Sequence, residues 1–412
     1  MKSIIYIAFI FMSLSLTAQE TINTMFYNLL EFPEASPGGR SEILRNIFSE
    51  YEPDIFMICE LQSEAGADEI LNISLNYDTN MYSRADFVDN QSGEADLQQL
   101  IYFKTNKFSL ESSEVLITPV RDINKYVLKL NTVDQETDPV IINVYVTHLK
   151  SSQGTANQNL RLDMVNEFTS DLEQLDPNAL VIFAGDFNIY TSSEPAYQEI
   201  LDNTNAIVMV DPIDTPGSWH NNDSYQDIHT QSTRIDSGPF GAGAGGGLDD
   251  RFDFITISEN MTSNPKLQYV SNSYKAFGNN GNCYNLDISD ESCLGEYNQQ
   301  IRNSLFSISD HLPVVMQLET NKEFILSNND VSIQDDFSIN NTLVNDYLTI
   351  STFNDLEANI TFSVYNTLGQ KIMKLDNFNH KTTNYNVSNL QSGLYYIKSN
   401  TSHSSVLKFL KK

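Results

Sequence analysis

Residues 180–188 read Leu-Val-Ile-Phe-Ala-Gly-Asp-Phe-Asn, a short apolar run that ends in an acid and an amide. A run of this length predicts a buried strand. The pattern recurs: other apolar runs end in Asn28, Glu60 and His148, Asp253 lies within 251–258, and Asp310 and His311 precede 312–318. One polar residue at a strand end usually starts a turn or caps a helix. Together they predict a single crevice, because strand ends on one edge of a sheet converge.

Helical and strand-like patterns alternate along residues 19–319. Residues 39–51, 65–73, 155–172 and 296–305 have helical spacing, and the predicted strands are 22–30, 54–59, 100–104, 126–130, 140–148, 179–185, 251–258 and 312–318. Mixed strands and helices of this kind predict an α/β fold with sheets covered by helices.

The residue types at the strand ends indicate a chemistry. Carboxylates and amides without thiolates prefer hard cations such as Mg²⁺, Mn²⁺ or Ca²⁺. His148 and His311 are suited to positioning water and stabilising charge at neutral pH. This combination predicts metal-dependent hydrolysis of a phosphate ester.

Charge narrows the class of protein. The 412 residues, 40% of them hydrophobic, provide for one large and one small domain. Lys and Arg number 24 against 54 Asp and Glu, a net charge of −30, which excludes a protein that coats nucleic acid with a basic face. It leaves open an enzyme whose metal ions supply positive charge. Residues 321–412 hold eight acids and eight bases, so the whole excess lies in 1–320.

The chain contains three cysteines, Cys59, Cys283 and Cys293. That number rules out a dense disulfide framework and a tetrahedral cysteine zinc site. Cys283 and Cys293 either pair in an oxidising compartment or stay free, and the sequence leaves both open.

The N-terminus has the features of a secretory signal peptide. Lys2 precedes an apolar run over 4–16 that is too short to span a bilayer, and Ala18 offers a small residue for cleavage. We therefore expect residues 1–18 to be removed. The alternative is an uncleaved N-terminal anchor.

The C-terminal part differs from the rest. We expect a catalytic domain over 19–322, a polar linker over 323–341 and a small antiparallel β-sandwich over 342–412, because short alternating runs there are separated by turn signals. Residues 345–348 (Asn-Asp-Tyr-Leu), 365–370, 390–397 and the final Lys-Lys resemble the type IX secretion sorting domain of Bacteroidetes. The resemblance implies export across the outer membrane, the secretion machinery as a partner and no catalytic role. A generic adhesive or carbohydrate-binding sandwich is the alternative.

Six segments occur in the order of a known motif set. They are residues 25–28 (Met-Phe-Tyr-Asn), 58–62 (Ile-Cys-Glu-Leu-Gln), 147–151 (Thr-His-Leu-Lys-Ser), 184–188 (Ala-Gly-Asp-Phe-Asn), 251–255 (Arg-Phe-Asp-Phe-Ile) and 309–313 (Ser-Asp-His-Leu-Pro). They resemble the endonuclease/exonuclease/phosphatase superfamily, whose deoxyribonuclease I-like fold is a four-layer α/β sandwich. The resemblance implies two packed mixed sheets flanked by helices, followed here by the small all-β domain.

The resemblance also implies roles for individual residues. Asn28, Glu60 and Asp310 match metal ligands, Asp186 the group that activates or orients water, Asn188 a donor to the scissile phosphate, and His148 a group that stabilises the oxyanion. His311 matches a general base or phosphate ligand held in its tautomer by Asp253. The choice between His311 and Asp186 as the base stays open.

Three further residues are candidates for substrate binding. Arg161 lies on the helix after His148, Trp219 is the only tryptophan, and Arg234 follows it in a polar segment. An arginine could reach a phosphate and a tryptophan could stack on a base. The alternatives are a solvated helix arginine and a tryptophan that packs in the core.

The sequence thus predicts a secreted or cell-surface phosphodiesterase that uses Mg²⁺, or Mn²⁺ or Ca²⁺, acts as a monomer and cuts DNA or RNA. A phosphatase or a sphingomyelinase-like phospholipid diesterase on the same fold is the alternative. A non-catalytic surface adhesin is a remote one.

Overall fold

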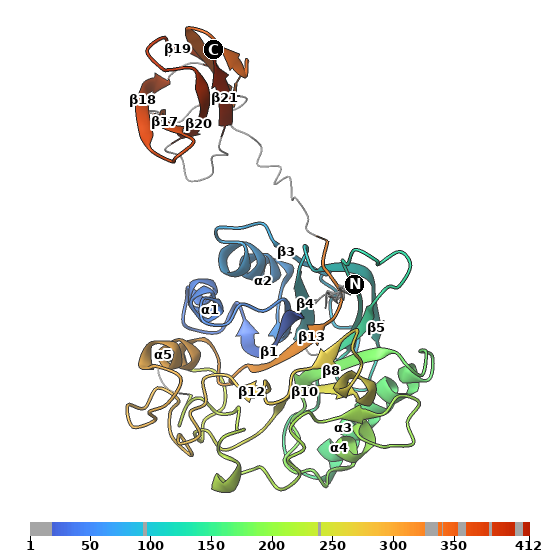
Figure 1. Cartoon of the computed structure of the whole chain (residues 1–412). Helices are drawn as coiled ribbons and strands as arrows, with labels where there is room; N and C mark the ends of the chain where they lie inside the picture. The colour runs from blue at the N-terminus through green and yellow to red at the C-terminus, as the bar shows by residue number, and fades with distance from the viewer. Residues whose placement is uncertain are drawn as a thin grey trace, which may run out of the picture. The chain divides into compact units, whose positions relative to one another are not determined.

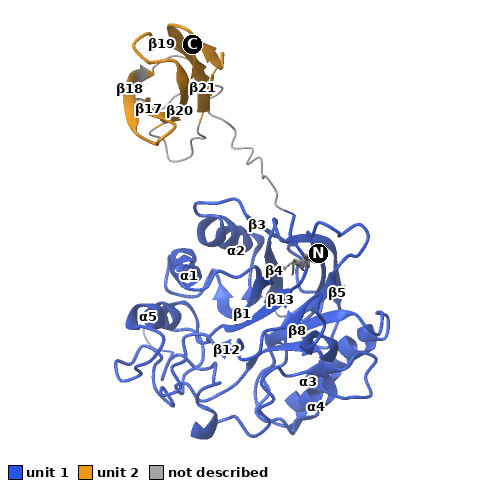
Figure 2. Ribbon diagram, in the orientation of Figure 1, with its two compact units in different colours: residues 1–325 blue, residues 326–412 orange. Residues whose placement is uncertain are grey.

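A computed structural model describes residues 19–93, 97–237, 240–325, 337–339, 341–352, 360–378, 381–399 and 407–412. The predicted signal peptide and most of the predicted linker lie outside these residues. The chain divides into two compact units, 1–325 and 326–412 (Figure 2). Each has a hydrophobic core of its own.

The first unit contains two mixed sheets. The strand order of one is β11-β13-β1-β2-β4-β3, with β12 also paired to β13. Its strands are β1 (Glu20–Phe32), β2 (Ile55–Leu61), β3 (Tyr82–Arg84), β4 (Gln98–Lys104), β11 (Gln268–Tyr269), β12 (Lys275–Ala276) and β13 (Val314–Thr320). The other sheet has the order β5-β6-β7-β8-β10-β9. Its strands are β5 (Phe108–Leu116), β6 (Ile123–Leu130), β7 (Ile141–His148), β8 (Leu180–Asp186), β9 (Met209–Val210) and β10 (Asp253–Ser258).

Helices cover the outer faces of the two sheets (Figure 1). One group is α1 (Arg40–Phe48), α2 (Glu64–Glu69) with the π-helical turn η1 (Ile70–Leu75), and α5 (Gln299–Ile308); the other is α3 (Thr155–Leu172) and α4 (Pro195–Ile200). Phe168 of α3 stacks on Phe183 of β8 with ring centroids 4.0 Å apart. The four-layer α/β sandwich is therefore confirmed. The expected helix over 296–305 begins later, because the Asn298 side chain caps α5.

The topology brings six strand ends together. β1 runs parallel to β2, and β7 runs parallel to β8. β13 is antiparallel to β1, and β10 is antiparallel to β8. The carboxyl ends of the four parallel strands therefore meet the amino ends of β10 and β13. Gly185 allows the closest approach of β7 and β8, since a Cβ there would lie 2.4 Å from the Thr147 carbonyl oxygen.

The second unit is all β. A three-stranded sheet (β14-β16-β19) and a five-stranded sheet (β15-β21-β20-β17-β18) share a core around Phe362 and Ile397. The strands are β14 (Phe337–Ile339), β15 (Leu343–Val344), β16 (Tyr347–Thr352), β17 (Ile360–Asn366), β18 (Lys371–Phe378), β19 (Thr382–Asn386), β20 (Gly393–Ser399) and β21 (Leu407–Lys411). The predicted C-terminal all-β domain is confirmed, and β14 lies within the segment expected as a linker.

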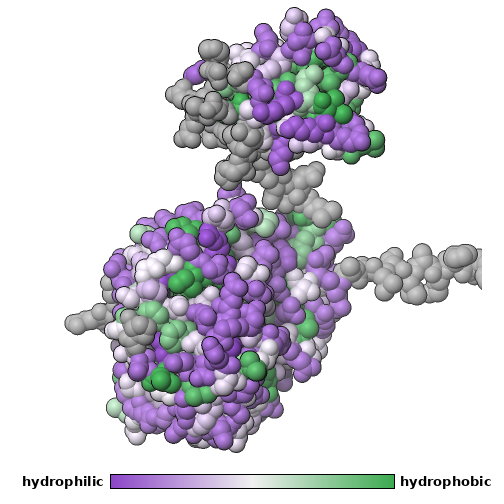
Figure 3. All heavy atoms as spheres, turned by 90° about the vertical axis from the view of Figure 1, so that its left-hand side faces the viewer, coloured by the Kyte–Doolittle hydropathy of each residue, from purple (hydrophilic) through white to green (hydrophobic). Residues whose placement is uncertain are grey.

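The cysteines, the helices and the surface each add one observation. Cys283 and Cys293 form a disulfide, which resolves the alternative left open by the sequence, while Cys59 is a buried free thiol. Among the described residues, no helix has both the length and the apolar character needed to cross a bilayer. The face of residues 1–325 drawn in Figure 3 is mostly hydrophilic, with hydrophobic residues scattered over it, as expected from the acidic composition.

Candidate active site

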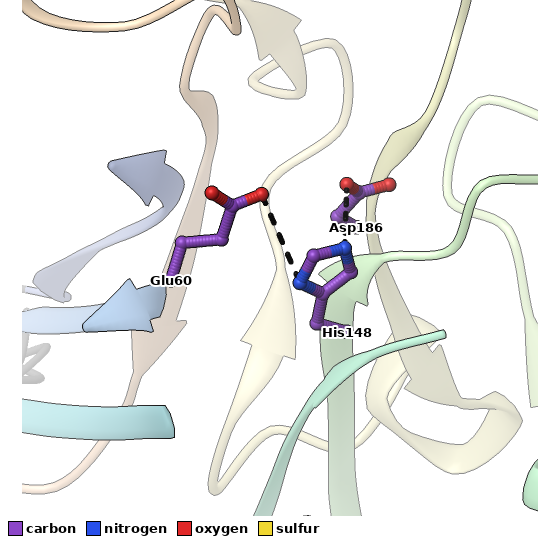
Figure 4. Close-up of side chains that lie close together, drawn as sticks. All are labelled: Glu60, His148 and Asp186. Atoms are coloured by element: carbon purple, nitrogen blue, oxygen red, sulfur yellow. Dashed lines mark ion pairs between the residues drawn. The ribbon is translucent and has the colours of Figure 1, made fainter. Parts of the chain in front are cut away.

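Glu60 at the end of β2, His148 at the end of β7 and Asp186 at the end of β8 face one another (Figure 4). His148 Nδ1 lies 3.9 Å from Glu60 Oε1, and His148 Nε2 lies 3.4 Å from Asp186 Oδ2. One ligand atom from each residue lies within 4.8 Å of the others. These three side chains, which come from both sheets, can therefore contact one small cation.

Asn28 connects the two sheets at this point. Its Nδ2 donates to Glu60 Oε1 (2.9 Å) and to Asp186 Oδ2 (3.1 Å), while its Oδ1 accepts from the Leu30 amide. Glu60 has a φ of 60°, a left-handed conformation that is costly for this residue and occurs at functional sites. Backbone geometry thus aims the Glu60 carboxylate at the cluster.

His311 is held by a buried acid. Its Nδ1 lies 2.8 Å from Asp253 Oδ2, and its Nε2 lies 3.7 Å from Asp186 Oδ2. Asp253 sits directly opposite Asp186 in the pairing of β10 with β8. The Ser309 hydroxyl, which accepts from the His311 amide, donates to the Asn28 carbonyl. The position of the ring is therefore fixed from two sides, and Asp253 fixes its tautomer.

Asp310 and Asn188 complete the cluster. Asp310 Oδ2 accepts from the Ala244 amide (2.7 Å) and from Gln231 Nε2 (3.1 Å). The Asn188 amide donates to Asp186 Oδ1 (3.0 Å), and Asn188 Nδ2 donates to the Leu149 carbonyl (3.3 Å). All eight residues expected from the sequence as catalytic or metal-binding are thus at one end of the two sheets.

Burial and crowding of acids shift the proton affinities of the cluster. Burial raises the pKa of Glu60, and the Asp310 charge adds to this effect. Burial also raises the pKa of Asp186 to about 7, although His311 opposes the shift. Burial lowers the pKa of His148 well below its ordinary value, and Arg121 adds to that effect. The carboxylates therefore carry a desolvation cost that a bound cation would relieve.

His311 shifts in the opposite direction from His148. Burial alone would lower its pKa, but the carboxylates of Asp253, Asp186 and Asp310 outweigh burial and raise the pKa well above the ordinary value. The two imidazoles of the cluster thus differ in proton affinity, as expected of groups with different roles in proton transfer.

The cluster fits a divalent metal. Asp310 Oδ1, Asp253 Oδ1 and His148 Nδ1 are buried and have no hydrogen-bond partner within the part of the chain that the structure describes. Buried polar atoms without a partner call for an unseen ligand. Carboxylate and amide oxygens with imidazole nitrogen suit Mg²⁺, Mn²⁺ or Ca²⁺.

The three expected substrate-binding residues have structural roles instead. Arg161 is fully buried, donates to Glu194 Oε2 at 2.8 and 3.0 Å and holds the Lys150 and Ser152 carbonyls. Trp219 is also fully buried and packs edge-on against Phe254 at 5.6 Å. Arg234 is buried and donates to backbone carbonyls, among them that of Phe306. Each side-chain nitrogen of these three residues already has an acceptor within the protein, so the structure favours a structural role over the expected contact with substrate.

Two residues near the cluster were not expected from the sequence. Arg121 donates to the His148 and Leu149 carbonyls at 2.8 and 2.6 Å. Gln231 contacts both Asp310 and His311 through one amide nitrogen. Neither belongs to a recognisable motif. Only the pairing of their segments with the strand ends reveals them.

Arg161 supplies a stability prediction. Replacing Arg161 by Met should lower the free energy of unfolding by about 3–5 kcal/mol, because the buried Glu194 carboxylate loses its partner. The double variant Arg161→Met, Glu194→Gln should recover part of the loss. Denaturant unfolding measures both. Unchanged stability combined with weaker substrate binding would instead restore the role expected from the sequence.

Comparison with known proteins identifies the C-terminal unit. Residues 344–412 match the family described as secretion system C-terminal sorting domain. The chain therefore carries an export signal at its C-terminus and is directed to the cell surface or secreted through the corresponding machinery.

Solved structures similar to the chain include endonuclease/exonuclease/phosphatase family proteins. One from Bacteroides thetaiotaomicron is 14% identical, with 74% of this chain and 96% of that chain covered and a TM-score of 0.45. D. rerio TDP2 complexed with a single strand DNA product is 14% identical, with 73% and 99% covered and a TM-score of 0.46. The human Nocturnin catalytic domain with bound sulfate is 15% identical, with 73% and 97% covered and a TM-score of 0.43. No curated protein matches the sequence.

Proposed function

We propose that the protein is an exported, divalent-metal-dependent phosphodiesterase that acts as an endonuclease on extracellular DNA or RNA. The observation that carries the proposal is the convergence of Glu60, Asp186 and Asp310 with two differently held histidines in one buried cluster. Acids and imidazoles without thiolates, some with unpartnered buried atoms, suit hydrolysis of a phosphate ester better than a structural role.

Glu60 and Asp310 would hold the cation, with Asn28 beside them and Asp186 within reach. When bound, Mg²⁺ or Mn²⁺ would neutralise charge on the phosphate. Asp310 Oδ1 is the free oxygen of its carboxylate, because Oδ2 is already occupied by Ala244 and Gln231.

The remaining residues would handle the water and the phosphate. Asp186 would activate or orient the attacking water, and either Asp186 or His311 would take its proton. In the first case His311 binds the phosphate as an imidazolium that Asp253 stabilises. His148 and the Asn188 amide donate to the phosphate oxygens as charge gathers there. Every one of these side chains is at least nine-tenths buried, so the donors act where water screens them little.

A phosphatase or phospholipid diesterase is the second candidate, and the charge distribution favours it. The whole net charge of −30 lies in residues 1–320. A long nucleic acid gains affinity from each phosphate that the protein neutralises. An acidic body therefore suits a small phosphoester better than tight binding of a polyanion.

A substrate panel tests both proposals. The full chain should hydrolyse plasmid DNA or RNA in the presence of Mg²⁺ or Mn²⁺, with weaker activity on sphingomyelin and on simple phosphate monoesters. The reverse order of rates would favour the second candidate. Absence of activity on every phosphoester in the panel with each of Mg²⁺, Mn²⁺ and Ca²⁺ would reject the proposed function.

The sorting unit should be dispensable for catalysis. Deletion of residues 326–412 removes a unit with its own core and should leave kcat and KM of the purified protein within about twofold, because the whole cluster lies in the first unit. In the producing cell the same deletion should stop export. Retained export, or loss of activity in the purified folded protein, would contradict this division of roles.

A further inference from the structure

The segment 230–233 lies between the strand ends that build the cluster. The Gln231 amide donates to the Asp250 carbonyl (3.0 Å), and the Asp249 and Asp250 amides donate to the Gln231 carbonyl (2.9 and 2.8 Å). On its other side Gln231 forms a bridge with His311. The backbone of Gln231 is therefore held from both sides, next to the start of β10 and the residues before β13.

The Gln231 side chain ends inside the cluster. Its Nε2 lies 3.1 Å from Asp310 Oδ2 and 2.6 Å from His311 Nε2. A carboxamide nitrogen has two hydrogens, so each can be aimed at one of these atoms. The residue is half-buried.

The contact with His311 occupies the place that a substrate needs. A phosphate oxygen bound by an imidazole lies about 2.7–2.9 Å from the ring nitrogen, and His311 Nδ1 is already taken by Asp253. Only Nε2 is left for the phosphate, and two side-chain nitrogens lie beside it, Gln231 Nε2 at 2.6 Å and Asn28 Nδ2 at 3.4 Å. Gln231 is the nearer. His311 Nε2 of the neutral ring accepts from Gln231, whereas in the imidazolium His311 Nε2 and Gln231 Nε2 are both donors, and a phosphate oxygen placed beside them would then accept from both.

We propose that Gln231 is a phosphate-binding residue of this site. The proposal rests on the proposed function. As the phosphate takes its place on His311 Nε2, one N–H of the carboxamide stays on Asp310 Oδ2 and the other donates to the phosphate oxygen. Gln231 thus connects the carboxylate of Asp310, which would hold the cation, to the bound phosphate. Its carboxamide is an uncharged hydrogen-bond donor.

Gln231 is not needed to hold the Asp310 carboxylate in position. The Ala244 amide also donates to Asp310 Oδ2, at 2.7 Å. A Cβ on Gly243 would lie 3.0 Å from both Cβ and Cγ of Asp310, so this backbone packs directly against the carboxylate. Without Gln231, Asp310 therefore still accepts from the Ala244 amide and still packs against the Gly243 backbone. Cation binding should survive loss of the carboxamide.

The test uses the full chain with Gln231→Met, which keeps the size of the side chain and removes both N–H donors. Gln317→Met is the matched control, because Gln317 is half-buried on β13 and donates to the Asn23 side chain. Binding of inorganic phosphate in the presence of Mg²⁺ is measured by calorimetry, Mn²⁺ binding by electron paramagnetic resonance, and kcat on bis(p-nitrophenyl) phosphate. Circular dichroism checks the fold.

We expect Gln231→Met to weaken phosphate binding at least about tenfold and to lower kcat by roughly 10²-fold, as for loss of one oxyanion donor, with Mn²⁺ affinity within about twofold of wild type. Unchanged phosphate affinity, or Mn²⁺ affinity that falls in the same proportion, would overturn the proposal. If Gln231→Met does not fold, Gln231→Glu replaces it, with weaker phosphate binding and no loss of Mn²⁺ affinity expected. A wild-type chain that binds phosphate through Gln231 but hydrolyses no phosphoester would reject the proposed function and leave the phosphate site standing.

Discussion

Replacing Asp186 by Asn should lower kcat by about 10⁴-fold, the loss typical of a central group in a catalytic cluster. Asp186 is the side chain that Asn28, His148 and His311 all approach, within 3.1 to 3.7 Å. Asparagine keeps the size and can still accept from the Asn188 amide, although its NH₂ group cannot accept from Asn28 Nδ2 as Asp186 Oδ2 does. It cannot carry the negative charge that attracts a cation and orients the water.

The fold should tolerate this change. Asp186 is buried among other acids, and burial raises its pKa to about 7, so a neutral side chain of the same size removes a desolvation cost. The lost bond from Asn28 Nδ2 acts in the opposite direction, so the thermal midpoint should change little while kcat falls. Asp249→Asn is the matched control. The backbone of Asp249 pairs with Gln231, but its side chain is not part of the cluster, so this replacement should have little effect on kcat. A kcat above about one tenth of wild type for Asp186→Asn would place the chemistry in another part of the molecule.

Much of the central fold could be predicted because buried strands have a simple pattern. β7 and β8 are mostly apolar and are buried on both faces of the sheet. β5 was not predicted, because Phe108–Leu116 reads Phe-Ser-Leu-Glu-Ser-Ser-Glu-Val-Leu and lies at the sheet edge with a register shift after Leu110. An edge strand with a solvated face lacks the hydrophobic run that marks a central strand.

The residues of the candidate site could be predicted where an acidic residue or a histidine lies at the end of an apolar strand. Glu60, His148 and Asp186 each close an apolar run, so the sequence alone groups them. Arg161 was assigned to the substrate because its partner Glu194 lies 33 residues away and nothing local shows that the pair is buried. Gln231 was missed for a related reason, since its segment has no periodic pattern and acquires its place only by pairing with residues 249–250 and 311.

Removal of divalent cations should abolish hydrolysis, with the rate falling at least about 10³-fold in EDTA and returning when Mg²⁺ or Mn²⁺ is added back. The physical reason is the charge of the cluster: Glu60, Asp186, Asp253 and Asp310 lie together, and the buried Arg121 contacts the backbone beside them rather than the carboxylates. Without a cation, this group would repel an anionic phosphate. Initial rates in EDTA, followed by titration with each metal, measure the effect.

Glu60→Gln separates a metal requirement at this site from one elsewhere. The amide oxygen can still accept from the Glu31 amide as Glu60 Oε2 does, but the bond from Asn28 Nδ2 to Oε1 is lost. This loss costs about 1–3 kcal/mol, so the fold should hold, while the charge that attracts the cation is removed. The Mn²⁺ concentration needed for half-maximal rate should rise at least about tenfold, because changes around a metal centre commonly cost 10- to 100-fold in affinity. Glu296→Gln, which breaks an exposed ion pair with Lys275, should leave that concentration unchanged. Since both variants remove one negative charge and only one lies at the cluster, equal shifts would mean that the cation acts through the general field of the acidic body. A shift confined to Glu60 would place the cation at the end of β2, where Glu60 lies.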